Sequence, residues 1–122
     1  MFVHPASFFE DRTFRVQSRT CFVIMPFALE WSDRVYAAVS ETVDGAGFTC
    51  RRGDDLRGRV ILTDIWEQIN RCEVVLADLT GDNPNVYYEL GIAHALGKEV
   101  IPIIQVGTSV PFDQQVFRVS FL

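Results

Sequence analysis

Two acidic residues, Asp78 and Glu89, are of a type and at positions in the sequence that would allow both carboxylates to act on one substrate. Asp78 directly follows the apolar run 74–77, and Glu89 lies in the helix-like segment that comes next. Ligands bind beyond the carboxyl ends of the strands in open α/β sheets, so we expect both carboxylates at one crevice. Cleavage of a glycosidic bond uses two carboxyl groups, a nucleophile or base and a proton donor. The pair therefore raises the question of whether this protein cleaves an N-glycosidic bond.

The expected roles of the residues follow from their positions. Glu89 suits the nucleophile, and its place near a helix N-terminus predicts a lowered pKa because the helix dipole favours the anion. Asp78 suits the proton donor for the leaving base, or a partner of the ribose hydroxyls. Phe27 is expected to stack on a base, and free amides at the start of the helix are expected to receive a phosphate. The predicted substrate-binding residues are Pro26, Phe27, Asp55, Asp82, Asn83 and Asn85.

The same residues also have structural interpretations. Asp78 suits a turn in which its side chain accepts backbone N–H groups. Segment 82–85 has the pattern of a helix start. Tyr87 and Tyr88 favour wall or core positions over a platform for a base.

Strand and helix patterns alternate around these residues. Short apolar runs suit strands that are buried on both faces, and stripes with a helical period lie between them. This alternation predicts parallel pairing through right-handed crossovers. We therefore expect an α/β fold with a three-layer, doubly wound, flavodoxin-like parallel sheet of about five strands. The expected strands are 21–25, 48–50, 73–78, 99–104 and 116–122, and the expected helices are 31–46, 61–72 and 84–97.

Local signals mark the helix ends. Ser32 is expected to cap the first helix. Asn83 is expected to cap the third, with Pro84 in the first helical position, where a missing N–H costs nothing. Gly97 is expected to end that helix. Segment 51–58 is predicted to be a polar loop.

The composition limits the class of protein. The 122 residues are 48% hydrophobic and 22% charged, which suits one globular domain with a hydrophobic core. The formal net charge of -5 argues against a nucleic-acid partner. We see no signal-peptide pattern and no run of the ~18 apolar residues that a membrane span needs, so we expect a cytoplasmic protein without membrane contact. We assign residues 1–19 to an N-terminal extension and 20–122 to the domain.

The remaining reactive residue types indicate no further site. Cys21, Cys50 and Cys72 lie in or beside apolar segments without C-x-x-C spacing, so we interpret them as reduced core thiols. His94 lies about 140° around the helix from Glu89 and is interpreted as structural. No spacing of His, Cys, Asp or Glu indicates a metal.

Missing motifs exclude several classes of α/β protein. The chain contains neither G-x-x-x-x-G-K-[ST] nor G-x-G-x-x-G, which excludes Walker-type and dinucleotide-fold sites. A receiver domain would place an acidic pair after its first strand. This chain has Met25, Pro26 and Phe27 there.

Five segments together resemble the nucleoside 2-deoxyribosyltransferase-like family and the bacterial TIR-like proteins related to it. The similarity spans about 20–117, and its most specific block is 83–91. The segments are VIMPF (23–27), DI (64–65), ADLT (77–80), NPNVYYELG (83–91) and AHALGK (93–98).

The resemblance implies a flavodoxin-like fold and cleavage of N-glycosidic bonds in nucleosides, nucleotides or NAD. It places the family's nucleophilic glutamate at Glu89 and its aspartate at Asp78. Transferases of the family have an acid six residues before the glutamate, where this chain has Asn83. They commonly show a tyrosine and a glycine near the first strand, where this chain has 25–27. TIR-like members often act after assembly, which implies a homo-oligomer.

These observations lead to one preferred function and its alternatives. We expect an N-glycoside hydrolase that cleaves the base–ribose bond of NAD or a nucleoside monophosphate through Glu89, with no cofactor and with NAD only as a substrate. The alternatives are a nucleotide-sensing or TIR-like assembly module without turnover, and a nucleoside deoxyribosyltransferase. The chain stops within an apolar strand, so a truncated chain is a further interpretation.

Overall fold

Short apolar runs form a parallel β-sheet in the computed structural model, which describes residues 14–53, 61–105 and 120–121. The order of the strands across the sheet is β2-β1-β3-β4-β5, and each neighbouring pair is parallel. Both faces of the central strands are buried, which explains why their sequences are continuously apolar. The strands are β1 (Thr20–Ile24), β2 (Thr49–Arg52), β3 (Val74–Asp78), β4 (Glu99–Ile104) and β5 (Ser120–Phe121).

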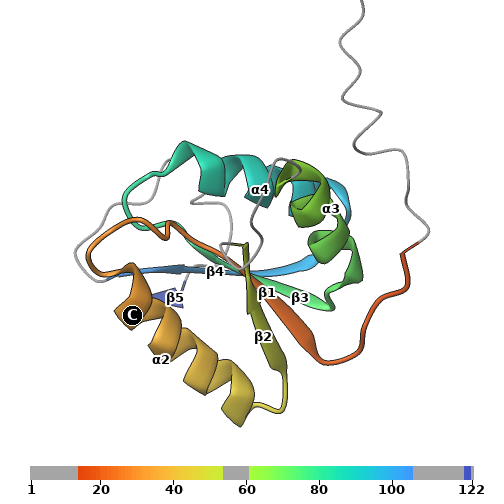
Figure 1. Ribbon diagram of the computed structural model, residues 1–122, viewed down its shortest axis with the longest axis horizontal. Coiled ribbons are helices and arrows are strands. Elements are labelled where there is room, and N and C mark those ends of the chain that lie inside the picture. Colours follow the sequence, from red (N-terminus) through yellow and green to blue (C-terminus); the bar gives the residue numbers. More distant parts are fainter. Residues whose placement is uncertain (1–13, 54–60, 106–119, 122) are drawn as a thin grey trace, which may run out of the picture.

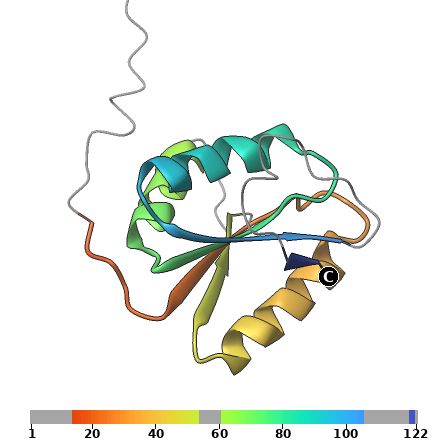
Figure 2. The ribbon, with the colours of Figure 1, turned by 180° about the vertical axis from the view of Figure 1, so that it is seen from behind.

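In the described part of the chain, three helices cover the two faces of this sheet. Helices α3 (Ile61–Arg71) and α4 (Pro84–Ala95) lie over the face that we call the upper face. Helix α2 (Ser32–Gly45) lies under the opposite, lower face, and the view from behind shows the same three layers (Figures 1 and 2). The predicted three-layer, doubly wound, flavodoxin-like α/β fold is confirmed.

The hydrophobic core is divided by the sheet into an upper and a lower cluster. Strand β3 shows the division, because Val75 and Ala77 belong to the upper cluster whereas Val74 and Leu76 pack against the lower one. Successive side chains of a strand point to opposite faces. Asp78, the next even-numbered position of β3, therefore lies on the lower face.

Helix α4 begins and ends where the sequence predicts. Asn83 is the N-cap, its side chain accepts hydrogen bonds from two helix amides, and Pro84 is the first helical residue. Gly97 has a φ of 72°, and the amides of Gly97 and Lys98 donate to the carbonyls of His94 and Ala93. This is the Schellman pattern, in which a left-handed residue closes the last turn. Val86, Leu90 and Ala93 form the buried stripe.

The predicted cap of α2 is wrong. Trp31 occupies the N-cap position, with no side-chain capping bond, and Ser32 is already the first helical residue. Ser32 is fully buried, and its Oγ accepts a hydrogen bond from the Leu29 amide at 3.2 Å. The Ser32 amide in turn donates to the Leu29 carbonyl at 3.0 Å. The serine therefore closes the loop before the helix instead of capping the helix itself.

Strand β2 extends further than the sequence predicted. Arg51 and Arg52, expected in a loop, pair with Phe22 and Val23 of β1. The guanidinium of Arg52 lies 4.1 Å from the centroid of the Tyr36 ring and 3.6 Å from an Asp33 carboxylate oxygen. Both partners belong to α2, so the charged side chain at the end of β2 contacts this helix.

The two ends of the chain are described only in part. At the C-terminal end, β5 comprises Ser120–Phe121 within the predicted strand 116–122, and 106–119 lie outside the described residues. At the other end, 14–19 contact the domain: the Gln17 amide donates to the Arg71 carbonyl at 2.7 Å. The boundary at residue 19 stays a prediction.

Candidate active site

A cavity of about 160 Å³ lies where β1 leads into α2 and where α4 begins. It is at the carboxyl edge of the sheet, the position that ligands occupy in this class of fold. Ligand pockets for drug-sized molecules measure roughly 300–1,000 Å³, so this volume suits a single ring. The described residues that line the cavity are Met25, Pro26, Phe27, Ala28, Leu29, Asn83, Asn85, Val86 and Glu89.

One wall comes from the loop after β1. Met25 and Pro26 are buried, and the chain then turns outward, leaving Phe27 43% exposed. Gly53, which follows β2, lies beside this ring: a Cβ built on Gly53 would be 4.0 Å from a Phe27 ring carbon. An exposed aromatic ring next to a cavity offers a stacking surface. Pro26 and Phe27 therefore lie where the sequence analysis expected them, and Met25, Ala28 and Leu29 complete a wall that it did not identify.

The opposite wall is the first two turns of α4. Asn85 and Glu89 are four residues apart, share one face of the helix and both line the cavity. Val86 and Leu90, on the neighbouring face, are buried and fix the helix against the upper core. The packing of α4 therefore directs its polar face to the cavity.

The Glu89 side chain is partly buried, and this burial raises the pKa of its carboxyl group from 4.5 to about 7. The predicted lowering of this pKa is wrong. The helix dipole acts mainly within the first turn, whereas Glu89 is in the second turn, so desolvation of the carboxylate outweighs it. At neutral pH, Glu89 is about half ionised. Side chains with strongly perturbed pKa values in clefts are candidates for function.

The N-terminus of α4 does not offer the free amides that were predicted to receive a phosphate. Asn83 Oδ1 accepts hydrogen bonds from the amides of Asn85 at 2.9 Å and Val86 at 3.3 Å. The Tyr87 amide donates to the Asn83 carbonyl at 3.2 Å, and Pro84 has no N–H. Each amide of the first turn is thus already paired or absent, because the capping residue is itself an asparagine.

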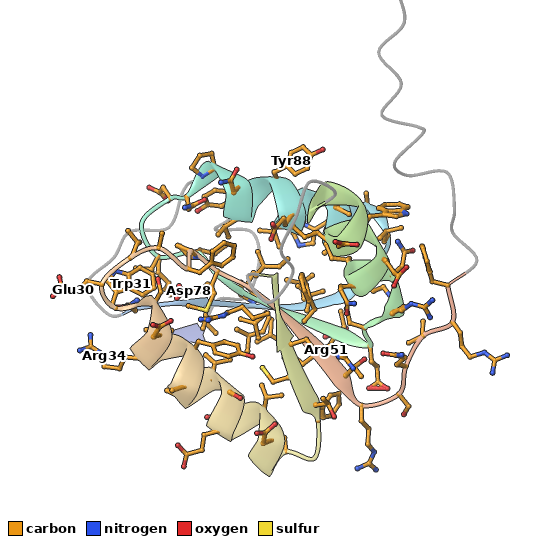
Figure 3. The ribbon with its side chains drawn as sticks, in the orientation of Figure 1. Glu30, Trp31, Arg34, Arg51, Asp78 and Tyr88 are labelled. Atoms are coloured by element: carbon orange, nitrogen blue, oxygen red, sulfur yellow. The ribbon has the colours of Figure 1, made fainter. Side chains whose placement is uncertain are left out.

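Asp78 does not line the cavity. It is 1% exposed, lies on the lower face of the sheet, and its Oδ1 accepts a hydrogen bond from the Thr80 amide at 2.9 Å. Its Oδ2 is buried and has no hydrogen-bond partner among the described residues. Figure 3 shows Asp78 inside the molecule and Tyr88 projecting from α4. Of the two predicted catalytic residues, only Glu89 therefore lines this cavity, and the turn interpretation of Asp78 describes its observed bond.

The remaining predicted residues also differ in whether the structure places them as expected. Asp82 is exposed and outside the cavity lining, and its Oδ1 accepts a hydrogen bond from the Tyr87 hydroxyl at 3.1 Å. Tyr87 is partly buried against the upper core, as expected. Tyr88 is 54% exposed, so its predicted wall or core position is wrong. Asp55 lies outside the described residues.

Two further residues hold the edge of the sheet, and neither belongs to the predicted catalytic or substrate-binding residues, although Thr80 follows the third strand, where site residues are expected. Thr80 Oγ1 accepts a hydrogen bond from the Gln105 amide at 3.0 Å, just beyond the end of β4. Thr80 stands two positions after Asp78 in a turn, a spacing typical of an Asx-turn. This spacing could have predicted the bond between Asp78 and the Thr80 amide. No local pattern in the sequence predicts the bond between Thr80 and Gln105.

The described residues give no sign of metal or thiol chemistry. Among them, no three His, Cys, Asp or Glu side chains gather closely enough to hold a metal ion. Cys21 and Cys72 are buried thiols of the core, as interpreted, and burial raises the pKa of Cys21 to about 12 and that of Cys72 to about 11. Thiols with such pKa values carry almost no thiolate at neutral pH and are poor nucleophiles. Within the same residues, no helix combines the length and apolar character that crossing a membrane requires.

The comparisons with known proteins place this architecture among solved structures. No protein-family model matches the chain, and no curated protein matches it. The TIR domain of the Toll-related receptor TRR-2 from Hydra magnipapillata is similar with a TM-score of 0.68 and 19% identity, over 83% of this chain and 82% of that one. The Clostridium botulinum CMP N-glycosidase BcmB is similar with a TM-score of 0.56 and 16% identity, over 84% and 87%. The chain thus shares its fold with a TIR domain and with a CMP N-glycosidase.

Proposed function

We propose that this chain is an N-glycoside hydrolase that cleaves the base–ribose bond of a nucleotide-type substrate, NAD or a nucleoside monophosphate, through Glu89. The observation that carries the proposal is a partly buried carboxyl group with a raised pKa on the wall of a ring-sized cavity at the carboxyl edge of the sheet. The shared fold with a CMP N-glycosidase supports it.

In the proposed reaction, the C–N bond to the base breaks and its electron pair leaves with the base. The ionised Glu89 carboxylate stabilises the positive charge at C1′ or forms a bond to that carbon. A water molecule then adds its oxygen to C1′; where Glu89 has bonded to that carbon, this bond breaks and its electron pair returns to the carboxylate. One proton of the water goes to the departed base or to solvent. Phe27 offers an aromatic surface to the base, and the amide of Asn85 lies beside the carboxylate on the same helix face.

The proposal depends on Glu89 and does not use Asp78 as a proton donor, because Asp78 is outside the described cavity lining. Hydrolysis is favoured over base transfer by the residue at position 83. An amide there neither gives nor takes a proton at neutral pH, and its Oδ1 is bound to the helix. We therefore propose water as the acceptor.

The decisive experiment is chromatographic detection of the free base after incubation with NAD and with the nucleoside monophosphates. The wild-type protein is expected to release base from at least one of them. Glu89→Gln keeps the size of the side chain and removes its charge, and we expect it to lose roughly 1,000-fold in kcat/KM. The matched control is Glu41→Gln, a change on the exposed face of α2, which should leave the rate unchanged.

The assay also separates the alternatives. Base release by Glu89→Gln at the wild-type rate would contradict the proposed mechanism. A product that carries a second base added to the mixture would indicate the transferase. Calorimetric binding of an intact nucleotide without any product would indicate the nucleotide-sensing module.

A further inference from the structure

The turn between β3 and α4 is tied to the ends of two strands through Thr80. Its amide donates to Asp78 Oδ1 at 2.9 Å, at the end of β3, and its Oγ1 accepts from the Gln105 amide at 3.0 Å, just beyond β4. The neighbouring Leu79 amide donates to the Ile103 carbonyl at 2.9 Å. Three hydrogen bonds thus fix the start of the turn to the sheet.

The next two residues of the turn have left-handed backbone conformations, which surrounding contacts must stabilise. Gly81 has a φ of 85° and Asp82 a φ of 51°. The left-handed region is unfavourable for residues other than glycine, although aspartate enters it more readily than most. Asp82 is held there by the hydrogen bond from the Tyr87 hydroxyl, which belongs to α4. The turn is therefore fastened to the sheet at one end and to the helix at the other.

Glu89 receives its position from this turn. Asn83 caps α4 directly after Asp82, and Glu89 follows in the second turn of the helix. A helix is stiff along its axis, so a shift of its first turn moves the Glu89 carboxyl group relative to the wall formed by the loop after β1. Displacements of about 1 Å at a catalytic group can cost 100-fold in rate.

From this geometry we propose that Asp78 and Thr80 are positioning residues, which fix the start of α4 so that Glu89 stays at the cavity wall, and that neither residue touches the substrate. The catalytic part of this inference rests on the proposed function. The geometric part does not, because the burial of Glu89 is a property of the protein without substrate.

The first test removes the bond between Thr80 and Gln105. Thr80→Val keeps the shape of the side chain and loses the acceptor, whereas Thr80→Ser keeps the acceptor. We expect Thr80→Val to lower kcat about tenfold with KM changed by less than about twofold, and Thr80→Ser to stay within about twofold of wild type. Thr42→Val is the control, since the Thr42 hydroxyl bonds to the Ala38 carbonyl on the exposed side of α2.

The second measurement needs no substrate. The Glu89 carboxyl carbon is followed by NMR as a function of pH in each variant. A loosened turn hydrates this carboxyl group, so its pKa should fall from about 7 toward 4.5 in Thr80→Val and stay near 7 in Thr80→Ser and Thr42→Val.

The third test separates positioning from proton donation by Asp78. Asp78→Asn keeps the acceptor for the Thr80 amide, and we expect it to retain kcat within about threefold with an unchanged pH profile. Asp78→Ala loses the acceptor and should behave like Thr80→Val. A loss in Asp78→Asn as large as that in Glu89→Gln would overturn the inference.

The outcomes keep the two proposals apart. If the wild-type protein hydrolyses nucleotides and Thr80→Val changes neither kcat nor the Glu89 titration, the positioning inference is wrong and the hydrolase survives. If no variant, including the wild type, releases base while the Glu89 titration shifts in Thr80→Val, positioning holds and the hydrolase is wrong. Should Thr80→Val fail to fold, Asp78→Ala compared with Asp78→Asn decides, because only Asp78→Ala loses the hydrogen bond to the Thr80 amide. Equal kcat and equal Glu89 titration in these two variants would show that the positioning inference is wrong.

Discussion

Glu89 and Asp78 stand near the same edge of the sheet but in different surroundings. Glu89 comes from a helix over the upper face and lines a cavity, where partial burial raises its pKa to about 7. Asp78 lies on the lower face, is almost fully buried and accepts a backbone hydrogen bond. The function of a carboxylate therefore depends on solvent access and hydrogen-bond partners more than on its place at the end of a strand. The two surroundings also predict opposite effects on stability.

The largest expected effect is on stability, at Glu89. Its pKa is raised from 4.5 in the unfolded chain to about 7 in the folded one, so folding favours the protonated form. The resulting stability is fully present below about pH 4.5 and is lost as the pH rises toward 7. Glu89→Gln should therefore raise the free energy of unfolding by about 3 kcal/mol at pH 8 and leave it unchanged at pH 4.

Urea unfolding of both proteins at the two pH values measures this difference. The control is Glu41→Gln, which should give no change at either pH. Equal stability of wild type and Glu89→Gln at pH 8 would show that the carboxyl group is not desolvated, and the contrast between the two acids would disappear.

Asp78→Ala should have the opposite sign. It leaves the Thr80 amide without its acceptor, which costs about 2 kcal/mol when the donor is shielded from water. Thermal unfolding should show a lower Tm than the wild type, with Asp44→Ala on the exposed face of α2 as the control. A variant as stable as the wild type would mean that the bond to Thr80 contributes nothing.

The pH dependence of the reaction sharpens the assignment of Glu89. If the ionised carboxylate acts on C1′, kcat/KM should rise about tenfold between pH 6 and pH 8 and level off above the pKa of about 7. Initial rates across this range test the prediction, and the residual activity of Glu89→Gln should lack the rise. A rate that falls with increasing pH would instead indicate that the protonated Glu89 is the active form.

The smallest expected effect is at Asn83, the N-cap of α4, which lies between Asp78 and Glu89 in the sequence. Asn83→Ala removes the acceptor of two amides at the start of α4 and should lower the free energy of unfolding by about 1 kcal/mol, measured by urea unfolding. Asn83→Asp keeps an acceptor and should cost less. If Asn83→Ala and Asn83→Asp are equally stable, the capping bond does not hold α4.

Much of the fold follows from local patterns in the sequence. The apolar run before Asp78 predicts a buried strand, and Asn83 followed by Pro84 predicts the start of α4. These signals act over a few residues, so they can be read without knowing the partners. The predicted helix cap at Ser32 failed because Ser32 is fully buried and bonds to Leu29. Burial of that kind depends on what packs against the loop.

The candidate site was predicted only in part. Pro26, Phe27, Asn83, Asn85 and Glu89 line one cavity because the loop after β1 and the start of α4 meet at the carboxyl edge, as topology alone requires. Asp78 and Asp82 do not line it, since the side on which a residue lies depends on strand alternation and turn conformation. Those details decide which of several nearby acids faces a ligand.

The sequence by itself determined the order of strands and helices, the cap and the C-terminal glycine of α4, and the presence of a carboxylate on that helix. The tertiary structure alone decided the face on which Asp78 lies, the link from Thr80 to Gln105, and the burial that sets the pKa of Glu89. The reason is the range of the forces involved. Helix and strand patterns arise from neighbours along the chain, whereas desolvation and hydrogen bonds across the sheet depend on residues that only the folded chain brings together.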